Sequence, residues 1–372
     1  MGSAQRHAIV LASLPFLQAV AATGTPESAG MSPEGLRTAA AIIESSVRAG
    51  EIGSASILVT RRGKTVLHQG FGSVSAKPDS VYLLASITKP VTACALMLLV
   101  ERGRVALNDP VSRYLPEFRG GERDKVTVRD LLAHTSGLPD MLPENVKLRR
   151  AHAPLSAFVE GTYKTPLLYT PGSDFAYQSM GILLAAEIVE KITGMRLRDF
   201  TKREIFEPLG MKNSAIGLGR FRIEDTVPAW VSPDANRDDT ERFGPNSPYW
   251  RDMGHPWGGM HSTVTDLTLL LTAMLNGTRV FSPATIRAMT SDQNTAIAAP
   301  WGLGWALGRS KAWNFFGDLV SSSTFGHAGA TGTVAWADPV TGVTCVILTD
   351  RLVQNGSLLR RVSNAVAASV RD

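Results

Sequence analysis

Ser86 and Lys89 are the residues of this 372-residue chain whose types and spacing best suit nucleophilic chemistry. Residues three apart share one face of a helix, so the amine can lie against the hydroxyl. A serine hydroxyl is a weak nucleophile until a neighbouring base takes its proton. Because Pro90 is tolerated only near the start of a helix, we expect Ser86 in the first turn of a helix that continues over 91–102. The positive helix end would lower the pKa of Lys89 and help the amine accept a proton.

A serine and a lysine at this spacing also fit a solvated pair on a helix surface, so the motif alone does not establish a catalytic site. Three further segments carry polar groups at predicted turns or strand ends. They are His134-Thr135-Ser136-Gly137, Tyr177-Gln178-Ser179 and His327-Ala328-Gly329.

In this order the four segments resemble the serine beta-lactamase and penicillin-binding-protein-like superfamily. The closest similarity is to its class C-like branch, which includes family VIII carboxylesterases, and it covers about residues 30–370. The resemblance implies that Ser86 attacks a carbonyl and forms an acyl-enzyme, while Lys89 and Tyr177 exchange the protons. It also implies an oxyanion site made by the backbone N–H groups of Ser86 and Ala330. Whether Lys89 or Tyr177 is the base stays open, because the two groups titrate together.

Two departures from the family pattern bear on the substrate. His327-Ala328-Gly329 stands where beta-lactamases carry K-[ST]-G, and a largely neutral histidine is a poorer anchor for a substrate carboxylate than lysine is. Ser179 stands where asparagine is usual, so an amide that could grip an acyl side-chain carbonyl is missing. We therefore place His327, Gly329 and Ser179 on the substrate side of the site and expect a neutral ester.

The expected activity is that of a carboxylesterase for short-chain esters. The alternatives are a D-aminopeptidase or DD-peptidase, a beta-lactamase-type amide hydrolase, an acyltransferase, and a non-catalytic peptidoglycan-binding relative. Individual residues also have plainer interpretations: His327 as a structural histidine and Tyr177 as a core tyrosine. Trp257, Trp250 and Tyr249 could wall an acyl pocket or pack their own loop.

The pattern along the chain predicts an α+β fold of the beta-lactamase type. Strand-like hairpins over 55–69 and 333–348 predict one antiparallel sheet shared by the two ends of the chain, with helices on its faces. The stretch 217–259 has little periodicity and is expected to be irregular. The predicted division is a single catalytic domain over 30–372, with an α/β part at about 30–85 and 300–372 and a mostly helical part at about 86–299.

Composition excludes several classes. Hydrophobic residues make up 44% of the chain, enough for a large core, and the net charge of +5 is scattered without the basic stripe of a nucleic-acid surface. No apolar run is long enough to span a membrane. The sequence has neither zinc-ligand spacing nor a G-x-S-x-G elbow, and we expect no metal, no cofactor and a small-molecule ester or amide as partner. The sequence leaves the oligomeric state open.

The first 22 residues bear on where in the cell the protein works. An apolar stretch after Arg6 and His7 resembles a signal peptide, which would make the protein periplasmic or secreted. A short N-terminal extension of a cytoplasmic protein is the alternative.

Overall fold

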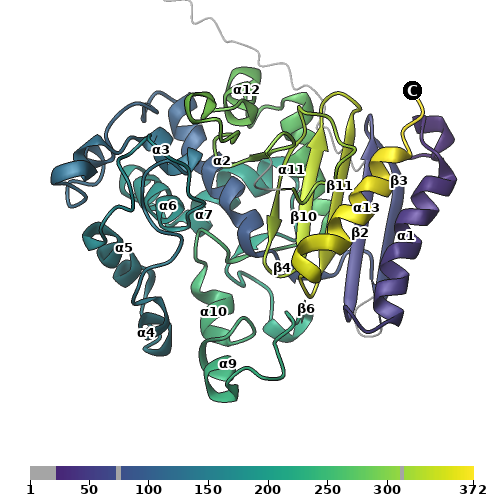
Figure 1. The fold of residues 1–372 in the computed structure, drawn as a ribbon, viewed down its shortest axis with the longest axis horizontal. Helices are drawn as coiled ribbons and strands as arrows, with labels where there is room; N and C mark the ends of the chain where they lie inside the picture. The colour runs from purple at the N-terminus through teal and green to yellow at the C-terminus, as the bar shows by residue number, and fades with distance from the viewer. Residues whose placement is uncertain (1–21, 73–76, 311–313) are drawn as a thin grey trace, which may run out of the picture.

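The computed structural model describes residues 22–72, 77–310 and 314–372 (Figure 1). The predicted signal peptide or extension therefore lies outside the described residues, apart from its last residue.

A seven-stranded sheet joins the two ends of the chain, as predicted. Its strand order is β1-β3-β2-β11-β10-β9-β8, and all neighbouring strands are antiparallel except β1 and β3. In the centre, Leu58 pairs with Val346, so a strand near the N-terminus and one near the C-terminus hold each other. The strands are β1 (Ala22–Thr23), β2 (Ser54–Arg61), β3 (Lys64–Gly72), β8 (Ala306–Leu307), β9 (Phe325–Gly329), β10 (Thr333–Asp338) and β11 (Val343–Thr349).

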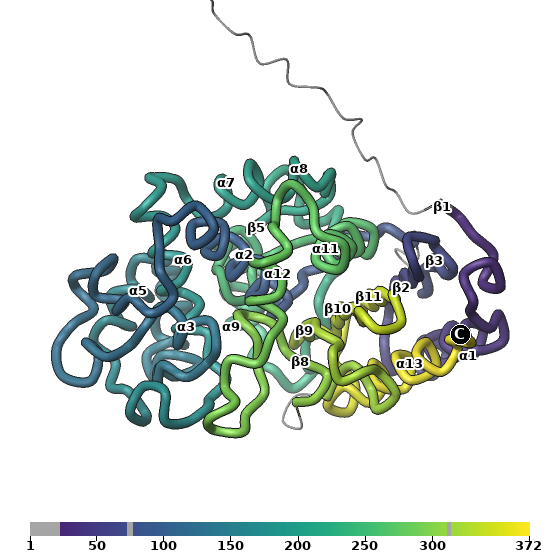
Figure 2. Tube along the Cα trace, turned by 90° about the horizontal axis from the view of Figure 1, so that it is seen from above, coloured from purple at the N-terminus to yellow at the C-terminus, as the bar shows by residue number. Residues whose placement is uncertain are grey.

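Helices cover both faces of this sheet. α1 (Pro33–Arg48) and α13 (Ser357–Ala368) lie together on one face, and α11 (Val264–Asn276) lies on the other (Figures 1 and 2). β2 shows the consequence: Ile57 and Val59 belong to the core under α1 and α13, while Leu58 belongs to the core on the opposite side. A strand buried on both faces reads as a continuous apolar run, and β2 does so.

The middle of the chain is mostly helical and packs around α2 (Thr88–Glu101). Twelve of the fourteen residues of α2 are buried, so the helix is enclosed on all sides. After α6 the chain forms α7 (Leu197–Thr201), which is followed by a π-helical turn, Lys202–Phe206. The remaining helices are α3 (Val128–Ala133), α4 (Asn145–Arg150), α5 (Leu155–Lys164), α6 (Met180–Thr193), α8 (Glu207–Leu209), α9 (Arg237–Phe243), α10 (Pro248–Met253) and α12 (Pro283–Thr290).

Two features of this region differ from the sequence prediction. The stretch 217–259 is not irregular throughout, because it contains α9 and α10, whose few turns are too short to produce a clear period. A second sheet of order β5-β7-β4-β6 was not predicted; its strands, β4 (Val81–Leu83), β5 (Ala215–Ile216), β6 (Thr226–Val227) and β7 (Met260–Ser262), have only two or three residues each. The predicted boundaries between the α/β and helical parts stay a prediction.

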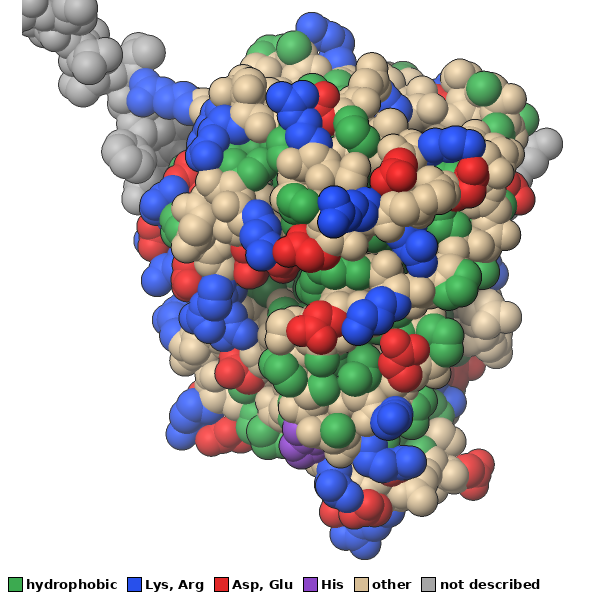
Figure 3. Space-filling view, turned by 90° about the vertical axis from the view of Figure 1, so that its left-hand side faces the viewer, with side chains coloured by type: hydrophobic (Ala, Val, Ile, Leu, Met, Phe, Trp, Pro, Cys, Tyr) green, Lys and Arg blue, Asp and Glu red, His purple; other side chains and the backbone are tan. Residues whose placement is uncertain are grey.

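Charges on the face formed by the helical part are mixed. Figure 3 shows basic and acidic side chains interspersed there, which agrees with the scattered charge of the sequence. Within the described ranges, no helix has the length and apolar character needed to cross a bilayer.

Candidate active site

Ser86 lies in a single 3-10 turn, η2 (Ala85–Ile87), between β4 and α2. The prediction of the first helical turn is therefore off by a few residues: α2 begins at Thr88, and Pro90 is its third residue, where an N–H would have no intrahelical acceptor. Ala85 has φ 50°, a left-handed conformation that is unfavourable for a residue with a side chain. Ser86 itself is half-buried. Surrounding contacts must hold this turn in place.

One set of contacts comes from the end of β9, the turn after it and the first residue of β10. Thr331 Oγ1 donates to the carbonyl of Leu83 (2.7 Å), and Thr333 Oγ1 donates to that of Leu84 (2.8 Å). Gly329 approaches so closely that a Cβ atom there would lie 2.1 Å from the Leu84 oxygen. The exposed Ala330 follows directly after Gly329, so it belongs to the segment that contacts the Ser86 turn; its role as an oxyanion donor stays a prediction.

A second set of contacts holds the turn from the side of β7. The backbone N–H of Leu84 donates to the Met260 carbonyl (2.9 Å), and that of Met260 donates to Thr88 Oγ1 (3.0 Å). Thr92 Oγ1 in turn donates to the carbonyl of Pro256 (2.7 Å). The nucleophile turn is thus fixed to two strands that are more than 160 residues away in sequence.

Lys89 lies against the nucleophile in a buried position. Its Nζ donates to Ser86 Oγ and to the Trp257 carbonyl, each at 3.1 Å, and the side chain is only 1% exposed. Burial lowers the pKa of Lys89 from 10.5 to about 7, while the Asp140 carboxylate acts in the opposite direction. The predicted direction is confirmed, but loss of solvent is the main cause. Near neutral pH a large fraction of Lys89 is a free amine that can take a proton.

Tyr177 lies on the other side of Lys89, whose Nζ is 4.7 Å from the centre of the phenol ring. The hydroxyl oxygen is buried, and burial raises the pKa of Tyr177, although a side-chain hydrogen bond with Ser86 acts the other way. The ring packs against His134 and Trp301, with centroid distances of 4.9 and 6.0 Å. Tyr177 is therefore a neutral phenol at ordinary pH, able to donate a proton near Ser86.

His327 completes this cluster, with its ring centre 6.0 Å from that of Tyr177. It is fully buried, and its Nδ1 donates to the carbonyl of Ala328 (2.7 Å). Burial, with a contribution from the charge of Lys89, lowers the pKa of His327 to about 3. A neutral imidazole offers no positive charge to a substrate carboxylate.

Ser179 and its partner show what the sequence reasoning missed. Ser179 is 1% exposed, and its Oγ donates to Asp140 Oδ1 at 2.6 Å. The Ser179 hydroxyl is thus bonded to the carboxylate of Asp140, an exposed residue. Gln178, between Tyr177 and Ser179, accepts from Ser136 Oγ (2.6 Å) and fixes the segment. The only signal for Asp140 in the sequence was its place three residues after the His134-Thr135-Ser136-Gly137 segment.

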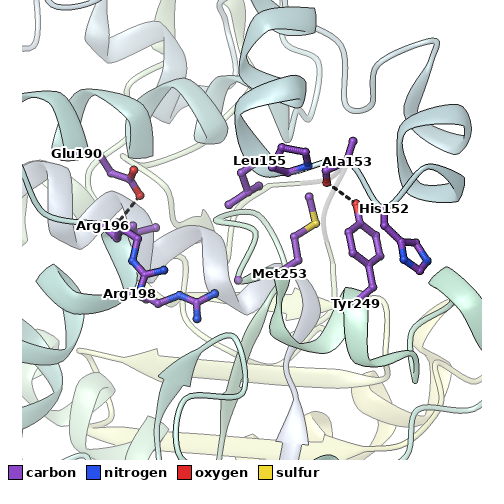
Figure 4. Close-up of a pocket in the computed structure, with 11 residues that line it drawn as sticks. His152, Ala153, Leu155, Glu190, Arg196, Arg198, Tyr249 and Met253 are labelled. Carbon is purple, nitrogen blue, oxygen red and sulfur yellow. Dashed lines mark hydrogen bonds between the residues drawn. The ribbon is translucent and has the colours of Figure 1, made fainter.

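The three predicted aromatic wall residues separate in space. The backbone carbonyl of Trp257 accepts a hydrogen bond from Lys89. The His255 ring lies between the two tryptophans, with its centre 4.2 Å from that of Trp250 and 4.8 Å from that of Trp257. Tyr249 instead lines a groove of about 380 Å³, where its hydroxyl donates to the Ala153 carbonyl (Figure 4). That groove lies between the residues before α5 and those of α7 and α10, and its lining does not include Ser86, Lys89, Tyr177 or His327.

The described part of the chain contains no group of three or more His, Cys, Asp or Glu residues placed to hold a metal ion. Cys94 and Cys345 are buried and unpaired, and burial raises the pKa of both thiols, so they are core residues.

Comparison with known proteins identifies the family. The beta-lactamase family model matches residues 39–368. A protein of Salmonella agona (strain SL483) named "Putative D-alanyl-D-alanine carboxypeptidase" is 30% identical over 376 residues, covering 89% of this chain and 86% of that protein. The chain therefore belongs to the beta-lactamase family, whose members are serine hydrolases.

Solved structures show the same fold. A penicillin-binding protein homologue from Caulobacter crescentus has a TM-score of 0.74 at 25% identity, covering 91% of this chain and 98% of that one. EstCE1, described as a hydrolase with promiscuous acyltransferase activity, has a TM-score of 0.74 at 19% identity, covering 90% and 99%. A D-amino acid amidase from Ochrobactrum anthropi SV3 has a TM-score of 0.67 at 23% identity, again covering 90% and 99%. These similarities agree with the predicted α+β fold of the beta-lactamase type.

Proposed function

We propose that the protein is an acyl-enzyme-forming hydrolase that cleaves short-chain carboxylic esters through Ser86, Lys89 and Tyr177. The observation that supports the choice of ester is His327: it is buried and neutral at the position where beta-lactamases carry a lysine. A substrate with a free carboxylate therefore gains no ion pair at this position, whereas a neutral ester needs none.

The geometry supports Lys89 as the base. Its Nζ is 3.1 Å from Ser86 Oγ, and its pKa of about 7 suits proton transfer at neutral pH, while the pKa of Tyr177 is raised. In acylation, a bond forms between Ser86 Oγ and the acyl carbon as the hydroxyl proton passes to Lys89. The bond to the alcohol oxygen breaks, and that oxygen takes the Tyr177 proton, which Lys89 replaces. Water then attacks the acyl-enzyme by the same steps in reverse and releases the acid.

The test is hydrolysis of p-nitrophenyl esters from acetate to octanoate, with nitrocefin in parallel and Ser86→Ala as the control. We expect turnover of the short esters, a loss of at least about 10³-fold in the variant, and little cleavage of nitrocefin. Ester turnover that survives in Ser86→Ala would refute the assignment. Nitrocefin cleaved faster than the esters would show that a neutral His327 does not exclude a substrate carboxylate.

A second candidate is hydrolysis of an amide or peptide bond next to a D-amino acid. The names of the Salmonella agona protein and of the Ochrobactrum anthropi amidase favour it. The exposed Asp140 carboxylate beside Ser179 also supports this candidate, because it could accept a hydrogen bond from the amino group of such a substrate.

A further inference from the structure

The groove that Tyr249 lines is separate from the catalytic residues and combines charged with apolar side chains. Its volume of about 380 Å³ lies within the range of small-molecule sites. Figure 4 shows Glu190, Arg196 and Arg198 together at one end of the groove and Tyr249 at the other. We call the first three residues the charged end.

Hydrogen bonds within the fold bring the charged end together. Glu190 Oε1 accepts from the backbone N–H of the residue between the two arginines, at 2.8 Å. Arg198 Nη2 donates to the backbone carbonyl of Asp252 at 2.6 Å, and its Nη1 lies 3.5 Å from the carboxylate of that residue. Arg196 Nε donates to Asp199 Oδ2 at 3.3 Å. These contacts leave the second oxygen of Glu190 and further guanidinium N–H groups available to a ligand.

The charged end carries both signs of charge, which restricts what can bind there. Among the described residues Glu190 forms no ion pair, so an anion alone would meet its uncompensated charge. A cation alone would in turn meet the two guanidinium groups. An α-amino acid avoids both repulsions, because its ammonium and carboxylate groups are attached to one carbon atom and can face opposite charges.

Beyond the charged end the groove is apolar and its shape is fixed. Leu155, Met253 and Tyr249 line it there, half-buried and packed against the core. The Tyr249 hydroxyl donates to the Ala153 carbonyl at 2.8 Å, and the His152 ring stacks on the phenol ring at 4.6 Å with an angle of 10°. An apolar group that enters such a preformed groove leaves water without ordering the wall that receives it.

We infer that this groove binds a free α-amino acid with a large apolar side chain. The ammonium group lies at Glu190, the carboxylate lies at Arg196 and Arg198, and the side chain covers Leu155 and Met253. A residue within a peptide lacks at least one of the two charges, so the free amino acid is the better fit. Binding here does not depend on the proposed ester chemistry, because none of the catalytic residues lines the groove.

Two analogues of leucine, each lacking one charge, test the inference by isothermal titration calorimetry at low ionic strength. 4-Methylpentanoate lacks the ammonium group, and 3-methylbutylamine lacks the carboxylate. Loss of a partly exposed ion pair amounts to about fivefold in affinity, so we expect each analogue to bind about fivefold more weakly than leucine. Alanine keeps both charges but lacks the large side chain, and it should bind more weakly as well.

Substitutions at the charged end should act selectively on these compounds. Arg196→Gln, at a side chain that is 68% exposed, should weaken leucine and 4-methylpentanoate about fivefold and leave 3-methylbutylamine unaffected or tighter. Glu190→Gln keeps an oxygen for the backbone N–H and should weaken leucine and 3-methylbutylamine, but not 4-methylpentanoate. Arg37→Gln, which removes an exposed arginine from α1, is the matched control and should change none of the affinities.

Several results would overturn the inference. They are equal affinities of leucine and its two analogues, an equal loss in Arg37→Gln and Arg196→Gln, and no saturable binding of leucine to the wild type. Leucine that inhibits ester turnover competitively, with an affinity unchanged in both groove variants, would bind at Ser86 instead and also overturn it. If Glu190→Gln does not fold, the exposed Arg196→Gln still decides. None of these results affects the proposed hydrolase, which Ser86-dependent ester turnover tests separately.

Discussion

Replacing Lys89 with methionine is expected to abolish activity and, at acidic pH, to stabilise the fold. Lys89 is 1% exposed, and its pKa falls from 10.5 in the unfolded chain to about 7. A pKa difference of about 3.5 corresponds to about 5 kcal/mol against the charged form in the folded state. Methionine has a similar length and carries no charge, so the substitution removes this unfavourable contribution.

The sign and the pH window follow from proton binding. Between pH 7 and 10.5 the unfolded state binds more protons at Lys89 than the folded state does, so wild-type stability rises with pH across that window. Below pH 7 the full cost of burying the charge is present, and above 10.5 it is absent. Methionine also leaves the Trp257 carbonyl without its donor, which costs about 1–3 kcal/mol at any pH.

We therefore expect Lys89→Met to be more stable than the wild type by about 2 kcal/mol at pH 6 and less stable at pH 10. Urea unfolding of both proteins at pH 6, 8 and 10 measures the difference, and other groups cancel because they titrate in both. Lys191→Met, which removes a lysine that is 53% exposed, is the matched control and should show no such trend. A stability difference between Lys89→Met and the wild type that does not change with pH would refute the assignment of the lowered pKa to burial.

Two further predictions concern the same site. For neutral esters, kcat/KM should fall about tenfold per pH unit below an apparent pKa near 7, because only the neutral amine of Lys89 accepts the Ser86 proton; a profile flat down to pH 5 would exclude Lys89 as the base. Gly329→Ala should lose roughly 2–4 kcal/mol of stability in urea unfolding and most of the ester activity, since its Cβ would lie 2.1 Å from the Leu84 carbonyl oxygen. Gly50→Ser, at a turn where a Cβ meets no atom within 4 Å, is its comparison: wild-type-like ester turnover is expected there, and equal losses in both variants would argue against the close approach of β9.

The sequence was most informative where a local pattern has one physical solution. The spacing of Ser86 and Lys89 brings Lys89 Nζ within 3.1 Å of Ser86 Oγ, because three residues make about one helical turn. A 3-10 turn has the same property, so the prediction holds although Ser86 lies in one. The two hairpins predicted the central strands of the sheet, since alternating or continuous β-branched runs between turn residues leave little choice. The short strands of the second sheet gave no such signal, because two or three residues show no period.

Several properties of the site arise only from contacts between distant segments. The sequence could not assign the base, because the pKa of about 7 for Lys89 comes from burial beneath Trp257 and Tyr177. Nor could it separate Tyr249 from Trp257, since both lie in one aromatic stretch, while in the fold Tyr249 lines a groove and the buried Trp257 accepts a hydrogen bond from Lys89. Asp140 was missed because its importance depends on Ser179, 39 residues later.

By itself, then, the sequence determined the kind of chemistry, the nucleophile and its neighbouring amine, and the α+β fold that carries them, because these follow from residue type, spacing and periodicity. Only the tertiary structure decided which groups are charged and which carboxylate lies beside the catalytic groups. Desolvation and electrostatic contacts are properties of the packed molecule, and no stretch of sequence contains them.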